Sequence, residues 1–236
     1  MFIKNRDDSS HYISLSDIMT ALMMVFMFIS VAIITQIQQE NVSALRESQQ
    51  KRQQHLAATM MDVVEHKLDR WGASVDADNL TITFVDDGGN GGVSGGGAVA
   101  DFRSRTLFDS GRSELRPEFE QVLSEFFPVY IKWVQKNKDY IQEIRIEGHA
   151  DSTPKAGQSE RESYFYNMEL SQTRARNVLK YCMSLPNFTD VDFKYMQGFI
   201  TANGFSFSRV IKDARGRENR AASRRVEFRA LPKSVF

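Results

Sequence analysis

The feature that most constrains this chain is an uncharged run near its start. Residues 18–34 read IMTALMMVFMFISVAII, with no charged side chain and only Thr20 and Ser30 polar. The hydrocarbon core of a bilayer, about 30 Å thick, requires roughly 20 helical residues. Extending the run to residues 13–37 gives that length and takes in one acid, Asp17. We therefore predict a transmembrane helix over residues 13–37.

A signal peptide and a buried core helix are both less consistent with this run. A signal peptide needs a small-residue cleavage site after its apolar stretch, and the TQIQQE that follows offers none. A helix that is apolar on every face is also hard to bury in so small a protein. The flanking charges leave the orientation open, because Lys4 and Arg6 precede the span while Arg46, Lys51 and Arg52 follow it.

The composition excludes several classes of protein. Lys plus Arg and Asp plus Glu both number 30, so the chain lacks the basic excess of a typical nucleic-acid binder, and we expect no nucleic-acid partner. The single cysteine, Cys182, excludes an internal disulfide framework and a cysteine-based zinc cluster. Apolar residues make up 42% and charged residues 25%, which is typical of a globular protein.

The chain divides into four parts. We predict a short polar tail over residues 1–12, the transmembrane helix, a stem or linker over residues 38–78, and a globular domain over residues 79–236. The stem is rich in Gln and charged residues and has rough helical spacing of apolar side chains, at Val42, Leu45, Leu56, Met60, Val63 and Val64. Two interpretations stay open: a helix that pairs with a second copy, or a solvated helix without a partner.

The globular part has an α+β pattern. Strand-like alternation occurs at residues 80–85, 141–146, 199–207 and 225–230, and a further strand is expected to end at residues 106–108. Helical spacing occurs at residues 117–134 and 168–181, with a polar loop over residues 151–163. We predict a mixed sheet covered on one face by helices. The glycine-rich residues 88–97 are not followed by Gly-Lys-Ser/Thr, so a phosphate-binding loop is not expected.

Asp17 is the first residue that could carry chemistry. An acid within a membrane span is a functional hypothesis by default, because its insertion is costly. Burial raises the pKa of a carboxylic acid and contact with water lowers it, which is the physical basis of a proton relay. The alternative is that Asp17, which follows Ser14 and Ser16 at the start of the apolar run, caps the helix.

A second group of residues suits a zwitterionic ligand. Asp151 follows a predicted strand, and Arg174 lies on one helix face with Asn167, Leu170 and Ser171, which are spaced i, i+3, i+4 and i+7. The acid could pair with an ammonium group and the arginine could fork onto a carboxylate. The alternative is a structural salt bridge between Asp151 and Arg174.

No catalytic constellation is apparent, and we expect no enzyme activity. His149 has no second histidine or cysteine at a zinc-ligand spacing, so no metal site is expected. Residues 209–229 carry eight Lys or Arg against three Asp or Glu. This basic stretch could bind an anionic polymer in an envelope sensor, although it is more typical of a solvated rim.

Four motifs resemble the OmpA-like peptidoglycan-binding domain, specifically the MotB-type stator subunit. They are LFDSGRSELRP at 107–117, IEGHAD at 146–151, NMELSQTRA at 167–175 and SRRVE at 223–227. The start of the span, SDIMTALMMVF from residue 16, is similar to the stator B-subunit motif in which the aspartate carries protons. Ala150 and Ser223 depart from the family pattern, and both remove polar groups near the expected ligand.

The resemblance implies a β-α-β-α-β-β sandwich that binds the diaminopimelate-bearing peptide of peptidoglycan. By motif match, Asp151 would contact the ammonium group of diaminopimelate and Arg174 its carboxylate. Tyr166, Asn167 and Leu170 would line the rest of the site. The domain would then be periplasmic, on a single-pass protein of the bacterial inner membrane with a cytoplasmic N-terminus.

The resemblance also implies a motor. Two such B subunits would sit inside a ring of five polytopic A subunits, and the flow of protons, or of sodium ions, past Asp17 would turn that ring without a bound cofactor. The chain is short for a flagellar stator, and its layout is similar to the B subunits of Zorya anti-phage defence systems. The alternatives are a passive tether of the membrane to the wall and a flagellar-type motility stator.

Overall fold

The computed structural model describes residues 8–86 and 106–233, with side chains from residue 17 onward. The predicted glycine-rich segment at residues 88–97 lies outside the described residues. The chain forms two compact units, Met1–Lys51 and Arg52–Ser234.

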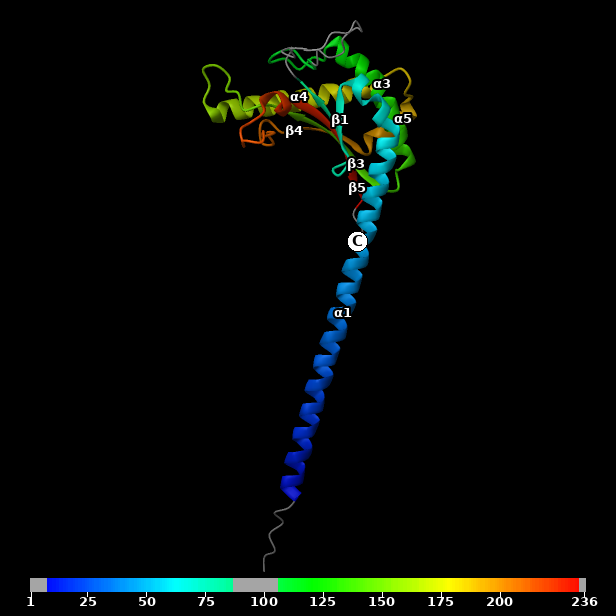
Figure 1. Cartoon of the computed structure of the whole chain (residues 1–236), viewed down its shortest axis with the longest axis vertical. Coiled ribbons are helices and arrows are strands. Elements are labelled where there is room, and N and C mark those ends of the chain that lie inside the picture. Colours follow the sequence, from blue (N-terminus) through cyan, green and yellow to red (C-terminus); the bar gives the residue numbers. More distant parts are fainter. Residues whose placement is uncertain (1–7, 87–105, 234–236) are drawn as a thin grey trace, which may run out of the picture. The chain divides into compact units, whose positions relative to one another are not determined.

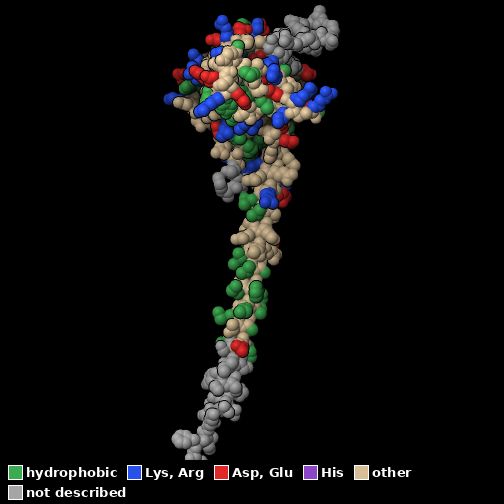
Figure 2. All heavy atoms as spheres, turned by 90° about the vertical axis from the view of Figure 1, so that its left-hand side faces the viewer, with side chains coloured by type: hydrophobic (Ala, Val, Ile, Leu, Met, Phe, Trp, Pro, Cys, Tyr) green, Lys and Arg blue, Asp and Glu red, His purple; other side chains and the backbone are tan. Residues whose placement is uncertain are grey.

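The first unit consists of the long helix α1 (Asp8–Val64), which continues into the second unit. Its apolar part reaches a mean hydropathy of 2.5 over 18 residues, with none of that window buried in the protein, so it is long and apolar enough to cross a membrane. Figure 2 shows hydrophobic side chains gathered along this part of the helix. Thr35 donates its hydroxyl hydrogen to the carbonyl oxygens of Val31 (3.0 Å) and Ala32 (2.8 Å), so this polar group is satisfied inside the helix.

The end of α1 belongs to the core of the second unit. Leu56, Met60 and Val64, spaced four residues apart, are almost completely buried, and the indole nitrogen of Trp133 donates to Thr59 Oγ1 at 3.1 Å. The domain was predicted to start at residue 79, but the compact unit starts at Arg52. In this part of the helix, the apolar residues therefore pack against the protein's own domain. The sequence had left open that they pair with a second copy of the chain. Helical spacing of apolar residues predicts that one face of a helix is buried, but it does not show which chain or element packs against that face.

The second unit is built on a mixed five-stranded sheet with the order β1-β2-β5-β3-β4. Strands β3 and β4 pair in parallel, and the other neighbours pair antiparallel. The strands are β1 (Ala73–Asp76), β2 (Thr81–Val85), β3 (Ile141–His149), β4 (Ile200–Gly204) and β5 (Arg225–Pro232).

Several shorter helices accompany this sheet. They are η1 (Glu65–Lys67), α2 (Leu68–Trp71), α3 (Pro117–Lys136), α4 (Glu160–Met183), α5 (Asp190–Gln197) and α6 (Arg220–Ser223). Figure 1 labels α3, α4 and α5 among them. Pro117 occupies the first turn of α3, where a missing N–H costs nothing. Ser159 and Glu162 form a capping box that starts α4. The order β2-α3-β3-α4-β4-β5 matches the predicted β-α-β-α-β-β sequence of elements.

Helices α3 and α4 cover the same face of the sheet. On the α3 side, the Phe126 ring packs edge-on against Phe84 of β2 and Phe228 of β5, with ring centroids 5.1 and 4.9 Å apart. On the α4 side, a Cβ added to Gly148 of β3 would lie 2.3 Å from the backbone oxygen of Ser171. Gly148 and Phe84 both pair with Val226, so they share one face. The α+β class and the helix-covered mixed sheet are confirmed.

Several predicted element limits differ from the structure. The strand expected to end at residues 106–108 is an isolated bridge between Phe108 and Leu115. Helix α4 begins at Glu160, within the predicted loop at residues 151–163. The sequence analysis missed this start because residues 160–162 are all charged and exposed and show no apolar periodicity. Strand β4 ends at Gly204, earlier than the predicted residue 207.

Candidate functional site: a charged cavity at the end of β3

The five side chains predicted to bind the wall peptide lie around one cavity of about 680 Å³. Strand β3 ends at His149 and places Asp151 at the rim, while α4 crosses that end of the sheet so closely that position 148 has room for glycine alone. The cavity is lined by Asp86, Thr106, Phe108, Asp109, Ser110, Gly111, Arg116, Ala150, Asp151, Thr153, Pro154, Lys155, Tyr166, Asn167, Leu170, Arg174 and Arg224. What these residues bind stays a prediction.

Asp151 is held as an ionised acid. Its carboxylate accepts a hydrogen bond from the backbone N–H of Thr153 at 2.8 Å and another from Arg224 Nη1 at 2.5 Å. Burial alone would raise the pKa of Asp151, but the hydrogen bonds from Thr153 and Arg224 outweigh it, so this pKa lies below its ordinary value. Asp151 is therefore ionised at neutral pH and lies in an ion pair with Arg224.

Arg174 reaches into the cavity from α4 and also holds the opposite loop. Its Nε donates to the carbonyl oxygen of Arg112 at 2.8 Å, and its Nη2 donates to that of Asp109 at 3.2 Å. Its guanidinium lies 4.7 Å from the centre of the Phe108 ring, a cation–π distance. Burial lowers the pKa of Arg174, but an arginine remains charged at neutral pH.

The alternative of a salt bridge between Asp151 and Arg174 is wrong for the described residues. Asp151 pairs with Arg224, and Arg174 bonds to backbone carbonyls. Two of the three guanidinium nitrogens of Arg174 already have carbonyl partners, so a ligand would meet chiefly its Nη1 edge. The simple fork onto a carboxylate that the sequence suggested is thus only partly available.

Arg224 lines the cavity as well, and the sequence analysis did not assign it to the site. Besides pairing with Asp151, its Nε donates to the carbonyl oxygen of Asp86 at 3.3 Å, and its own backbone oxygen accepts from the Asp86 N–H at 2.8 Å. These bonds tie the entrance to β5 to the end of β2. The SRRVE motif contains two arginines, and sequence alone could not show that Arg224 lines the cavity whereas Arg225 pairs with Glu227.

The two departures from the family pattern have different consequences. Ala150 lines the cavity, as expected. Ser223 does not line the cavity: it is fully buried, and its hydroxyl oxygen accepts a hydrogen bond from the backbone N–H of Ile211 at 2.9 Å. The expectation that Ser223 removes a polar group near the ligand is therefore wrong, because this residue serves the packing of the segment before β5.

A buried cluster on the other face of the sheet also escaped the sequence analysis. Glu147, His149 and Glu227 offer ligand atoms that lie within 4.8 Å of one another. The register pairs Glu147 with Glu227 directly across β3 and β5, which no local spacing reveals. Three guanidinium groups already hold the two carboxylates, those of Arg209, Arg225 and Arg229. Because these cations would repel a metal ion, the arrangement is a charge network that supports the end of β3.

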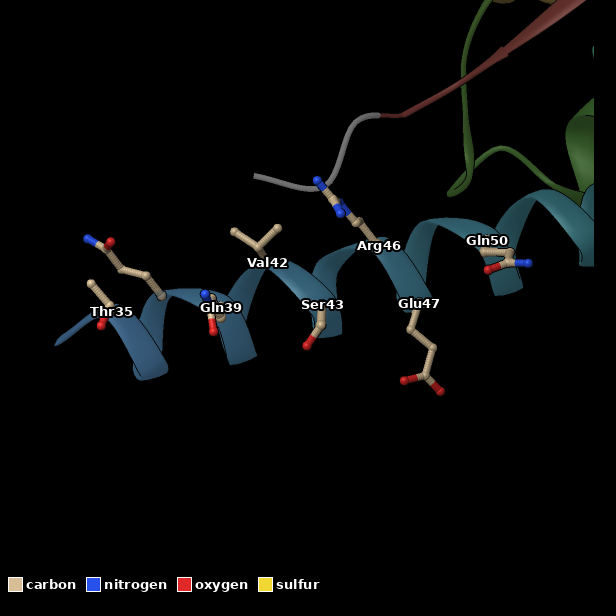
Figure 3. Close-up of a pocket in the computed structure, with 8 residues that line it drawn as sticks. Thr35, Gln39, Val42, Ser43, Arg46, Glu47 and Gln50 are labelled. Carbon is tan, nitrogen blue, oxygen red and sulfur yellow. The ribbon is translucent and has the colours of Figure 1, made fainter. Parts of the chain in front are cut away.

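Asp17 lies in the first unit, inside helix α1. The helix begins at Asp8, nine residues earlier, so the alternative that Asp17 caps its N-terminus is wrong. Further along the same helix, a polar hollow lies on the stretch that follows the apolar run (Figure 3). The described residues that line it are Thr35, Gln38, Gln39, Val42, Ser43, Arg46, Glu47 and Gln50, all from α1. The hollow holds neither Asp17 nor any of the predicted binding residues.

Comparison with known proteins shows the family of the chain. Residues 107–227 match the OmpA family. The chain belongs to the OmpA family. It is also 32% identical over 231 residues to the Zorya protein ZorB of Escherichia coli (strain Crooks), covering 97% of this chain and 90% of that protein. A second ZorB, from Escherichia coli O139:H28, is 25% identical over 238 residues, covering 96% and 83%. The chain is thus a relative of the ZorB proteins.

Solved structures with a similar fold include a MotB-like protein from Desulfovibrio vulgaris. It has 21% identity and a TM-score of 0.48, and the match covers 79% of this chain and 97% of that one. The cell wall anchor of the T6SS from Pseudomonas aeruginosa has 21% identity and a TM-score of 0.42, with coverage of 73% and 96%.

Proposed function

We propose that the chain is the B subunit of a wall-anchored membrane motor used in anti-phage defence. In this proposal α1 crosses the inner membrane with its N-terminus in the cytoplasm, and the OmpA-family domain binds peptidoglycan in the periplasm. A ring of polytopic A subunits, five for two B chains, surrounds the membrane helices. Protons, or sodium ions, pass Asp17 and turn the ring around the anchored B subunits.

The observation that carries the ion pathway is the position of Asp17. It is an acid in the interior of a continuous helix, immediately before the uncharged residues 18–34. An acid at this depth is costly unless it faces a protein interior or a water-filled path. A partner subunit that supplies such a path would explain why the carboxyl group is there.

The anchoring role is supported by the cavity. Asp151 and Arg174 line it together but do not neutralise each other. Separate fixed charges of opposite sign suit a zwitterion such as the free end of diaminopimelate. A motor that turns a ring needs a fixed point, and a bound wall peptide would supply it.

The deciding experiment replaces the carboxyl group of Asp17 in cells that carry the chain and its polytopic partner. We expect Asp17→Asn to abolish protection against phage while the partner still co-purifies, because the amide cannot exchange a proton. Asp17→Glu should keep part of the activity. Asp62→Asn, at an exposed acid later in the same helix, is the matched control and should leave protection unchanged.

Two outcomes would contradict the proposal. Full protection with Asp17→Asn would remove the ion pathway and leave a passive tether. Restored swimming of cells that lack their own flagellar B subunit, without any protection against phage, would assign the chain to motility.

A further inference from the structure

We propose that Lys155 is a second anion contact of the cavity and makes it selective for a wall peptide in which both carboxylates of diaminopimelate are free. This inference rests on the proposed binding of wall peptides and adds which chemical form of the peptide is bound. A diaminopimelate peptide whose side-chain carboxylate is free would be preferred over the same peptide with that group amidated.

The cations around the cavity differ in whether an acid neutralises them. Four cations line it, and two of these are already paired with acids of the lining. Arg224 binds Asp151 at 2.5 Å, and Arg116 binds Asp109 at 3.3 Å. The other two cations are Lys155 and Arg174.

Arg174 is a buried cation that no acid neutralises at contact distance. Its residue is 8% exposed, and within the part of the chain that the structure describes it makes no ion pair within 4.0 Å. Carbonyl oxygens hold two of its nitrogens. Burial lowers the pKa of Arg174 and the charge of Asp86 offsets part of this effect, but no acid contacts the guanidinium among the described residues, so an incoming anion would stabilise it.

Lys155 lines the same cavity and lies over the ring of Tyr166, another lining residue. Its Nζ is 3.7 Å from the centre of the Tyr166 ring, and Tyr166 lies two helical turns before Arg174 on α4. Among the residues with described side chains, Lys155 forms no ion pair with an acid. The ring face attracts the ammonium but accepts no ordinary hydrogen bond, so the N–H donors of Lys155 remain available to a ligand.

The loop that carries Lys155 is fixed to the start of α4. Its backbone N–H donates to the hydroxyl oxygen of the buried Ser163 at 3.1 Å, and its carbonyl oxygen accepts from the Gln158 N–H at 3.0 Å. Lys155 is thus an exposed side chain on an anchored backbone. Because the backbone of this loop is already fixed, binding a ligand through Lys155 avoids the entropic cost of ordering a mobile loop.

Among the described residues that line the cavity, Lys155 and Arg174 are therefore the cations without an acid within 4.0 Å. A complementary ligand brings two neighbouring carboxylates, as terminal diaminopimelate does, and one would meet Arg174 while the other would meet Lys155. Amidation removes the charge from one carboxylate and would leave Lys155 with a neutral partner. For a partly exposed ion pair we expect a preference of roughly threefold to fivefold for the free acid.

The test measures the binding of two synthetic peptides to the purified full-length chain by fluorescence anisotropy. Both carry L-Ala, γ-D-Glu and diaminopimelate, and they differ only in whether the diaminopimelate side-chain carboxylate is free or amidated. The unaltered chain should prefer the free acid, Lys155→Gln should bind both peptides equally, and Lys155→Arg should keep the preference. Lys132→Gln, at an exposed lysine of α3 outside the cavity, is the matched control.

Three outcomes would overturn the inference. Equal affinity of the unaltered chain for the two peptides would show that the second carboxylate does not contribute to binding. Equal weakening of both peptides by Lys155→Gln would mean that the lysine only holds Tyr166 in place. Failure of the unaltered chain to bind either peptide would overturn the peptidoglycan assignment itself together with this inference.

Discussion

Glu227 illustrates how single residues are held in this domain. It lies inside the charge network of the sheet, where burial alone would raise its pKa. The neighbouring His149 ring and the Arg225 guanidinium lower the pKa of Glu227 from 4.5 to about 2. The Arg225 Nε to Glu227 Oε1 distance is 2.6 Å.

This arrangement predicts a pH-dependent stability. The folded-state pKa lies below the unfolded one, so the stabilisation is complete above pH 4.5 and is lost as the pH falls toward 2. We expect Glu227→Gln to lower the free energy of unfolding near neutral pH by at most about 3 kcal/mol. The difference from the unaltered chain should shrink in thermal unfolding below pH 4.5, and a constant difference down to pH 2 would contradict it.

A comparison of variants at Arg174 and Asn177 can distinguish the loss of a ligand contact from the loss of a contact with the loop at residues 109–113. Asn177 lies one turn later on α4 and also binds this loop, because its Nδ2 donates to the carbonyl oxygen of Ser113 at 2.8 Å. Asn177 does not line the cavity. Arg174 and Asn177 therefore both bind the loop, and they differ chiefly in that Arg174 alone can reach a ligand in the cavity.

We predict that Arg174→Ala strongly reduces sedimentation of the full chain with isolated peptidoglycan sacculi. Loss of a charge-assisted contact costs about 1.5–3 kcal/mol, or roughly a tenfold to hundredfold loss of affinity. Asn177→Ala is the control and should sediment nearly as before. Equal losses for both variants would mean that Arg174 acts only by holding the loop.

At the scale of elements, helix α1 serves two environments. Its early part is apolar and exposed, whereas Leu56, Met60 and Val64 are buried in the domain core. The sequence predicted both helical stretches but placed the domain boundary too late. A periodic apolar face has the same appearance whether it packs on a partner chain or on the protein's own sheet.

The buried end of α1 predicts a stability effect confined to that end. Met60→Ala should destabilise the domain by about 2–5 kcal/mol, because it leaves a cavity in a packed core. Leu45→Ala, at an exposed position of the same helix, should change the unfolding midpoint little. Both are measured by denaturant unfolding of the full chain in detergent, and a neutral Met60→Ala would contradict the packing.

At the scale of the whole molecule, the proposed function requires two activities on one chain. Anchoring without ion flow would leave a tether, and ion flow without anchoring would leave no fixed point. A chain that anchors normally but cannot carry ions should therefore interfere with an unaltered copy in the same complex, since two B chains are proposed to share one ring.

We predict that co-expressing Asp17→Asn with the unaltered chain reduces protection against phage. The variant should lose this effect when combined with a deletion of residues 18–34, because it can then no longer enter the membrane complex. Phage plating efficiency at matched expression levels is the measurement. Full protection in the mixture would argue against two B chains per motor.

The sequence by itself determined the apolar span, the α+β class and the family, because hydrophobic periodicity and short motifs are local properties of the chain. It also selected Asp151 and Arg174, although it did not determine their partners. Only the tertiary structure decided that Arg224 pairs with Asp151, that Glu147 meets Glu227 across two strands, and that the end of α1 lies in the domain core. These contacts join residues far apart in the chain, and strand register and helix packing, which no local spacing encodes, bring them together.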